Sequence, residues 1–181
     1  MKSEFAIVTP KSIKIGDDSY FEEYAQDPKR LSELTYSQKI PSDFIGHIVI
    51  EETTEKIGDL DTHWNDFIVV FAKDVLLKLD VEENQEEEYC PLVSIYKNGY
   101  ALEDGKKKLF ELGCDTASFS IYLDRNICHF NTLSDGLYGT VTEHYENDKL
   151  TGIVFEGWLD SAAMDHDELV NVFKNLFEVK E

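Results

Sequence analysis

Apolar and polar residues alternate over short stretches along most of the chain, which is typical of β-strands half-buried in a sheet. DFIGHIVIEET (43–53) shows this alternation through Ile45, Ile48 and Ile50. NDFIVVFAKD (65–74) is almost continuously apolar, as expected of a central strand covered on both faces. The same pattern predicts a first strand or hairpin over 4–9 and 12–15, interrupted by Pro10, and a strand over 75–81 that continues 65–74 after a bend.

Turn residues divide the later strands into hairpins. Asn98-Gly99 lies between alternating flanks in 91–102, and both residues tolerate the positive φ of a type I′ turn. Asp124-Arg125-Asn126 separates two strands in 117–132, and Asn147-Asp148 lies midway in a long hairpin over 137–160. The sequence therefore predicts three antiparallel hairpins in its second half.

Helical periodicity is clearest at residues 165–180, where five apolar residues fall on one stripe: Leu169, Val172, Phe173, Leu176 and Phe177. Asp165 and Glu168 have the spacing of a capping box. A second, shorter helix is predicted over 27–34, because Asp27 suits an N-cap and Pro28 suits the first helical position. Residues 105–113 fit either a helix or a strand.

These elements predict an α+β fold in a single domain over 1–181, a length that can bury a sufficient core. We expect a mostly antiparallel, curved sheet with the C-terminal helix packed on one face and one or two short helices elsewhere. The regular alternation of strand and helix that marks a doubly wound fold is missing.

Net charge narrows the classes of partner. The chain has 37 Asp and Glu against 17 Lys and Arg, which gives a net charge of −20. Both halves contribute, with −12 over residues 1–90 (21 acids, 9 bases) and −8 over 91–181 (16 acids, 8 bases). Such a field repels nucleic-acid phosphates and anionic lipid and accelerates encounter with basic proteins. We therefore expect neither nucleic acid nor membrane as a partner.

Cysteine use and hydropathy favour a soluble, cytoplasmic protein. The chain has three cysteines, Cys90, Cys114 and Cys128, whereas a disulfide scaffold needs an even number. None has C-x-x-C spacing, and we expect each to be a small buried apolar side chain. The start MKSEFAIVTPK lacks the apolar stretch of a signal peptide, and no run approaches the length of a membrane span.

Catalytic or metal-binding motifs are weak. DLDTHWND (59–66) offers Asp61 and His63, with Asp59 and Asp66, as a conceivable metal group, but a turn between strands favours the same residues. Nucleophile motifs and phosphate-binding glycine loops are missing. Paired carboxylates such as Glu156 and Asp160 arise by chance in so acidic a chain. We expect no cofactor and no bound metal, and an enzyme is the less favoured class.

The acidic surface is the remaining signal. Glu82, Glu83, Glu86, Glu87 and Glu88 crowd seven positions without a base, which alone is typical of a solvated loop. A whole-chain charge of −20 exceeds what solubility requires, however, and favours capture of a basic protein. The predicted contact residues are those five glutamates first, then Glu51, Glu52 and Asp61, with exposed aromatics such as Trp64, Tyr89 or Tyr145 as anchors.

The chain resembles a class of proteins in this respect. Acid-rich segments at predicted strand ends, EETTEKIGDLD (51–61), DVEENQEEE (80–88) and EHYEND (143–148), lie in an α+β chain that is poor in catalytic motifs. In type it is similar to the small acidic immunity proteins that bacteria make against nuclease-type toxins of polymorphic and contact-dependent systems. The resemblance implies a cytoplasmic protein that binds a cognate toxin and blocks its active site or its access to substrate. Alternatives are a secretion chaperone, a nucleic-acid-mimicking inhibitor, or an enzyme with a metal near Asp61 and His63.

Overall fold

A computed structural model of the chain describes residues 1–73, 77–81, 93–97, 100–101, 106–111, 118–131, 137–161 and 164–180. The elements of the first half are β1 (Lys2–Ile7), β2 (Ser12–Asp17), α1 (Asp18–Glu23), α2 (Pro28–Leu34), β3 (Tyr36–Lys39), β4 (Phe44–Ile57), β5 (Leu60–Lys73) and β6 (Leu77–Val81). Those of the second half are β7 (Val93–Lys97), β8 (Tyr100–Ala101), β9 (Lys106–Glu111), β10 (Ser118–Tyr122), β11 (Ile127–Asn131), β12 (Leu137–Glu146), β13 (Lys149–Asp160) and α3 (His166–Leu176).

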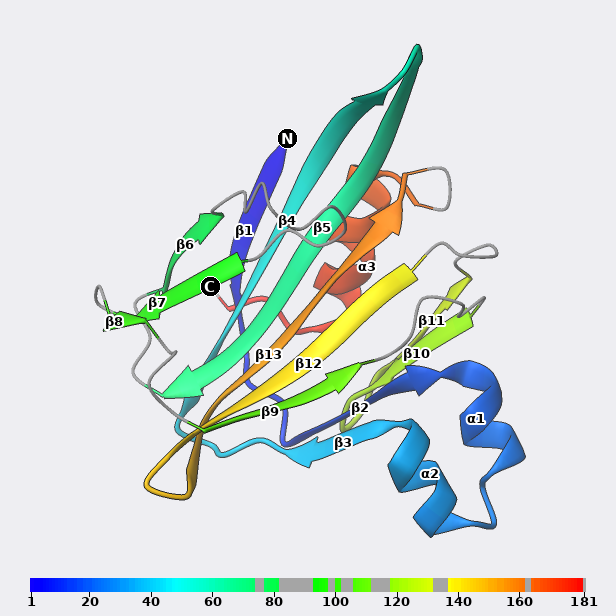
Figure 1. Cartoon of the computed structure of the whole chain (residues 1–181). Helices are drawn as coiled ribbons and strands as arrows, with labels where there is room; N and C mark the ends of the chain where they lie inside the picture. The colour runs from blue at the N-terminus through cyan, green and yellow to red at the C-terminus, as the bar shows by residue number, and fades with distance from the viewer. Residues whose placement is uncertain are drawn as a thin grey trace.

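The strands form antiparallel sheets, and the predicted α+β class is confirmed (Figure 1). The largest sheet has the order β1-β4-β5-β13-β12-β9, and the second has the order β11-β10-β2-β3. β6, β7 and β8 form a third, smaller sheet. Where one curved sheet was predicted, the chain therefore builds two principal sheets.

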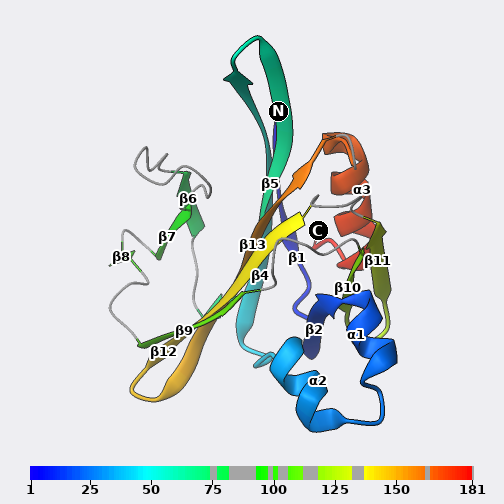
Figure 2. The same cartoon turned by 45° about the vertical axis from the view of Figure 1, so that its right-hand side comes forward.

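The layers lie on either side of the six-stranded sheet (Figure 2). α3 and the four-stranded sheet lie on one side, and β6–β8 lie on the other. We call the face toward α3 the inner face and the opposite one the outer face. β5 is buried on both, since Phe67 and Phe71 of the inner face and Ile68 and Val70 of the outer face are at most 3% exposed. The prediction of a doubly covered central strand is confirmed.

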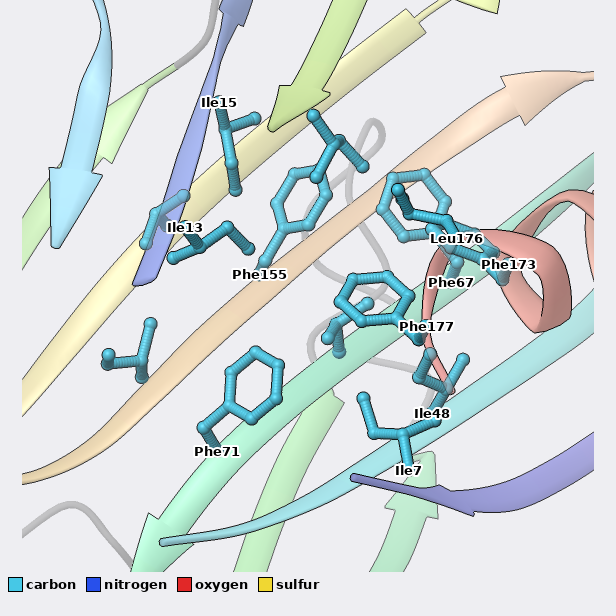
Figure 3. Close-up of a cluster of buried hydrophobic side chains, with 14 of the residues drawn as sticks. Ile7, Ile13, Ile15, Ile48, Phe67, Phe71, Phe155, Phe173, Leu176 and Phe177 are labelled. Carbon is cyan, nitrogen blue, oxygen red and sulfur yellow. The ribbon is translucent and has the colours of Figure 1, made fainter. Parts of the chain in front are cut away.

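The main core fills the space between the inner face, α3 and the second sheet (Figure 3). The ring of Phe67 lies 5.1 Å from that of Phe155 and 5.4 Å from that of Phe173, between centroids. Ile15 of β2 and Ile121 of β10 close the core from the second sheet. Interdigitated aromatic and β-branched side chains of this kind supply most of the stabilisation that a domain gains from burial.

α3 forms where its pattern predicts. The Asp165 carboxylate accepts from the amide of Glu168, and the Glu168 side chain accepts from the amide of Asp165, which completes the capping box. The helix ends at Leu176, earlier than the predicted 180, because the chain then runs beside β1. There Val179 forms a bridge with Ile7.

The shorter helices are partly as predicted. α2 begins at Pro28, and the Asp27 side chain accepts from the amide of Arg30, as expected of its N-cap. α1 was not predicted, because DSYFEE is too short to show helical periodicity. Asp17 caps it by accepting from the amide of Ser19 at 2.9 Å.

The predicted hairpins form. Asn147 and Asp148 have φ of 52° and 59°, the positive values that a type I′ turn between β12 and β13 requires. β10 pairs with β11 around residues 123–126. β7 pairs with β8, with Lys97 opposite Tyr100, while Asn98 and Gly99 lie outside the described residues.

Other expectations need correction. β1 and β2 do not pair, because β1 joins β4 and β2 joins β3 and β10. β6 belongs to the third sheet and does not extend β5. Residues 106–111 are a strand, which settles the ambiguity over 105–113. Ile45 is 39% exposed on the outer face, whereas Ile48 and Ile50 lie in the inner core, as the period of two requires of an odd and two even positions.

A buried carboxylate joins the two principal sheets. Glu143 of β12 is 4% exposed. It accepts hydrogen bonds from the Tyr36 hydroxyl at 3.0 Å, the Gln38 amide at 2.6 Å and the Tyr145 hydroxyl at 3.1 Å. Burial, and then the Glu143 charge, raise the pKa of Tyr36, which therefore stays a hydrogen-bond donor.

Candidate functional site

The β4–β5 hairpin projects beyond the sheet that carries it (Figure 1). On one side the pairing of β1 reaches only Glu51, which lies opposite Lys2. On the other side β13 reaches Trp64, which lies opposite Asp160. Residues 53–62, which we call the arm, pair with each other and with no other strand in the described part of the chain. Among the described residues, the arm is therefore a two-stranded ribbon with both edges unpaired.

A tight turn closes the arm. Ile57 lies opposite Leu60, which leaves Gly58 and Asp59 as the two-residue loop. Gly58 has φ of +64° and an added Cβ would meet nothing within 4 Å, so conformation and not space favours glycine. Glycine at the first loop position with positive φ is the signature of a type II′ turn, whose twist matches that of the flanking strands.

The tip of the arm is apolar and exposed. Ile57 is 60% exposed and Leu60 is 73% exposed, and the two side chains are cross-strand neighbours. Neither contributes to the core, so folding of this chain does not account for them. A paired apolar tip on a projecting ribbon is a typical anchor for another macromolecule.

Carboxylates surround this tip. Residues 51–66 carry six acids and one base, Lys56, which gives −5 of the total −20 within 16 of 181 residues. The six acids are Glu51, Glu52, Glu55, Asp59, Asp61 and Asp66. Residues 156–168, with five acids and no base, also carry −5, and residues 17–33, which include α1 and α2, carry six acids and two bases, or −4. Residues 51–66, which contain the arm, thus combine many acids with large apolar side chains exposed on both strands.

The strand period divides the arm into two faces. Glu55, Ile57, Leu60 and Trp64 lie on the outer face, and the Thr53 hydroxyl donates to Asp66 at 2.7 Å on that side. The inner face carries the other set, namely Glu52, Thr54, Lys56, Asp61 and His63. Acid, apolar tip and indole therefore share the outer face of one ribbon.

Two half-buried carboxyl groups, Asp66 and Glu156, lie on the outer face of the six-stranded sheet, near the base of the arm. Burial raises the pKa of Asp66 to about 6, and the charge of Glu51 adds to the rise while the bond from Thr53 opposes it. Burial raises the pKa of Glu156 to about 7, against a hydrogen bond from Thr140 and with the help of the Asp66 charge. One oxygen of each carboxyl group, Asp66 Oδ1 and Glu156 Oε2, is buried without a hydrogen-bond partner. Such groups hold protons close to neutral pH.

The residues considered as a metal group do not converge. Asp61 and His63 share the inner face, and the His63 ring nitrogen Nδ1 lies 3.0 Å from the Thr54 hydroxyl. Asp66 lies on the outer face, where it bonds to Thr53, and Asp59 lies in the turn at the tip of the arm. Within the described ranges, no group of three or more His, Cys, Asp and Glu side chains is placed to hold a metal ion.

A serine, a histidine and an aspartate meet elsewhere, outside the arm. The Ser120 hydroxyl lies 2.7 Å from Asp18 Oδ1 and 2.6 Å from His129 Nδ1, and the last two atoms are 3.1 Å apart. In a hydrolase triad the serine and the aspartate bond to opposite nitrogens of the imidazole. Here both are at Nδ1 and Ser120 is fully buried, so this cluster ties α1 to the second sheet. The observed register of the β10–β11 hairpin places Ser120 opposite His129, but no local signal in the sequence places Asp18 beside them.

The predicted contact residues divide into two groups. Glu51 and Trp64 are half-buried on the outer face, Glu52 is half-buried on the inner face, and Asp61 is exposed. Tyr145 is half-buried, and its hydroxyl donates to Glu143. The other six, Glu82, Glu83, Glu86, Glu87, Glu88 and Tyr89, lie outside the described residues. Sequence reasoning missed the exposed tip, Ile57 and Leu60, although Gly58-Asp59 between apolar residues is a hairpin signal.

The one cysteine in the described ranges is unreactive in character. Cys128 of β11 is half-buried and forms no disulfide. Burial raises the pKa of its thiol to about 11, which disfavours the thiolate that nucleophilic chemistry needs.

Comparison with known proteins finds no family model, curated protein or solved structure that matches this chain. Within the described residues, every helix is too short or too polar to cross a membrane.

Proposed function

We propose that this protein binds a basic protein through the arm and acts as an immunity-type inhibitor of a toxin. The observation that carries the proposal is the arm itself, a projecting ribbon whose exposed tip, Ile57 and Leu60, is flanked by Glu55, Asp59 and Asp61. Apolar anchors give affinity, and the surrounding carboxylates select a partner rich in Lys and Arg.

Charge supports a fast encounter with such a partner. A net charge of −20 attracts a cationic protein over distances of about 10 Å, set by the screening length at ordinary salt. Electrostatic steering of this kind raises association rates by roughly 10- to 1,000-fold. An inhibitor that must reach its toxin before the toxin reaches its substrate benefits directly from this rate.

Shape supports inhibition of an enzyme more than the role of a secretion chaperone. A ribbon that projects from a sheet can enter a concave active site, which a flat acidic face cannot do. The toxin class expected from this chemistry acts on an anionic substrate, because its active site must itself be basic to attract phosphates. The carboxylates of the arm then occupy the positions that substrate phosphates take.

The test is protection of growing cells. A basic toxin domain, taken first from a secreted protein encoded beside this chain, is expressed together with the wild-type protein or with the double variant Ile57→Asp and Leu60→Asp. We expect the wild type to restore growth and the double variant to fail, because two charges at the tip oppose burial. Ile127→Asp is the matched control, since Ile127 is also exposed, at 56%, but lies on β11.

The control should protect as the wild type does. Full protection by the Ile57→Asp and Leu60→Asp variant, at equal protein level, contradicts a role for the arm.

A further inference from the structure

The backbone at the edge of the arm has a defined direction. The amide of Glu52 donates to the carbonyl of Met1 at 2.9 Å, so the backbone groups of Glu52 point away from β5. In an antiparallel strand the N–H and C=O of one residue point to the same side, and the side alternates with each residue. Thr54 and Lys56 therefore direct their N–H and C=O groups to the open edge of β4, and Thr53, Glu55 and Ile57 direct theirs to β5.

The open edge is accessible. Thr54, Glu55, Lys56 and Ile57 are all exposed, and no strand in the described part of the chain pairs with them on this side. The pairing of β1 reaches Glu51 and the Met1 carbonyl reaches Glu52, so an added strand at residues 53–57 would lie in line with β1 along the same edge of β4. Four backbone groups, those of Thr54 and Lys56, are in position to receive it.

A third strand would also complete the ribbon energetically. A two-stranded hairpin without packing on either face is only marginally stable in water, and a third strand adds hydrogen bonds and cross-strand contacts. The arm of this protein is such a hairpin from residue 53 to residue 62.

We propose that the partner contributes a basic strand that pairs with the open edge of β4 at residues 53–57. This inference rests on the proposed function and specifies its mode, which is addition of a strand and not contact of side chains alone. The added strand carries Lys or Arg beside Glu55 and an apolar residue beside Ile57, because these side chains share the outer face. A second copy of this chain is disfavoured as the occupant, since it would place Glu55 against acidic residues of its own kind.

The probe is a short synthetic peptide, capped at both ends, that repeats Lys-Thr-Val-Thr, so that Lys and Val follow one another along the same face of the added strand. Its control has the same sequence with alternate backbone nitrogens methylated, which keeps the charge and the side chains but prevents pairing. Amide hydrogen exchange, followed by NMR on the labelled full chain, reports each backbone amide separately. In the free protein the amides of Thr54 and Lys56 should exchange fast, and those of Thr53, Glu55 and Ile57 should be slower.

The peptide should slow exchange at Thr54 and Lys56 by about tenfold or more, and the methylated peptide should not. The variant Lys56→Pro removes one outward donor without touching the bonds between β4 and β5, since proline is tolerated at a strand edge. It should weaken peptide binding about fivefold relative to Lys56→Gln, which also lacks the charge. Thermal unfolding of both variants verifies that each is folded.

The outcomes separate this inference from the function it refines. If both peptides bind equally at the arm, and Glu55→Gln weakens both, the strand pairing is wrong and the acidic capture stands. If neither peptide perturbs the arm amides, capture of basic chains by the arm is itself contradicted. Slowed exchange at Glu55 in place of Thr54 and Lys56 would overturn the assignment of the edge.

Discussion

The carboxyl group of Glu156 gives a prediction at the scale of single residues. Burial raises its pKa from 4.5 to about 7, and that of Asp66 from 3.8 to about 6. Between these limits the folded chain binds more protons than the unfolded chain. The free energy of unfolding therefore falls as pH rises from about 4 to about 7, and the penalty is fully present above that window.

Glu156→Gln should remove the share of this penalty that Glu156 contributes, about half. At about pH 8 the variant should be more stable than the wild type by roughly 1–2 kcal/mol, and near pH 4 the difference should vanish. Urea unfolding at both pH values measures it, with the exposed Glu146→Gln as a control that should change neither value. Loss of stability at about pH 8 in Glu156→Gln would contradict the burial of an ionised carboxylate there.

Glu143 is also buried, but unlike Glu156 it accepts hydrogen bonds from three side chains. Glu143→Ala leaves the Tyr36, Gln38 and Tyr145 donors without their acceptor and opens the contact between the two principal sheets. We expect a loss of about 2–4 kcal/mol in the free energy of unfolding, and a smaller loss for Glu143→Gln, which keeps one acceptor. Equal stability of Glu143→Ala and wild type in urea would exclude this network as a structural link.

The role of a residue is predictable from the sequence when its hydrogen-bond partner lies close by in the chain. Asp27 and Asp165 were predictable as caps, because each bonds to an amide three residues away. Glu143 and Asp66 were not, because their environment comes from strands that are distant in the sequence. A charged residue within a strand gives no sign in the sequence of whether it will be buried.

At the scale of elements, α3 and the arm should respond differently to truncation. Phe173 of α3 is 1% exposed and packs on Phe67, so Phe173→Ala should cost about 3–5 kcal/mol of stability. Leu60→Ala at the arm tip should change stability by no more than about 0.5 kcal/mol. Urea unfolding of the two variants measures the contrast. A large loss in Leu60→Ala would mean that the tip serves the fold of this chain and is not reserved for a partner.

Elements with strong local signals were predictable in kind and in place. The β12–β13 hairpin follows from Asn147-Asp148, and α3 follows from its apolar stripe. The separation of β1 from β2 was not predictable, because the pairing of each depends on distant strands. The acids of the arm are evident from the sequence, but its projection depends on where the pairing of β1 and of β13 with the hairpin stops.

At the scale of the whole molecule, two acidic segments differ in what surrounds their charges. The segment that includes α1 and α2 carries −4 over residues 17–33, close to the −5 over residues 51–66, yet neither helix buries a residue or exposes an apolar pair. The helical segment therefore contributes to the long-range field, and in our proposal the arm adds direct contact with the partner. Composition predicted the field, and only the structure identified which acids flank apolar anchors.

The central claim is that the acids of the arm meet the partner directly. The most direct test is the association rate with the toxin domain identified by protection, measured by stopped flow at low and high salt. Glu55→Gln with Asp61→Asn removes two charges from the arm, and Glu22→Gln with Glu23→Gln removes two exposed charges from α1. We predict that the arm pair slows association about tenfold at low salt and that the α1 pair changes it by less than about twofold. Equal effects of the two pairs would contradict the claim and leave only a general attraction between opposite charges.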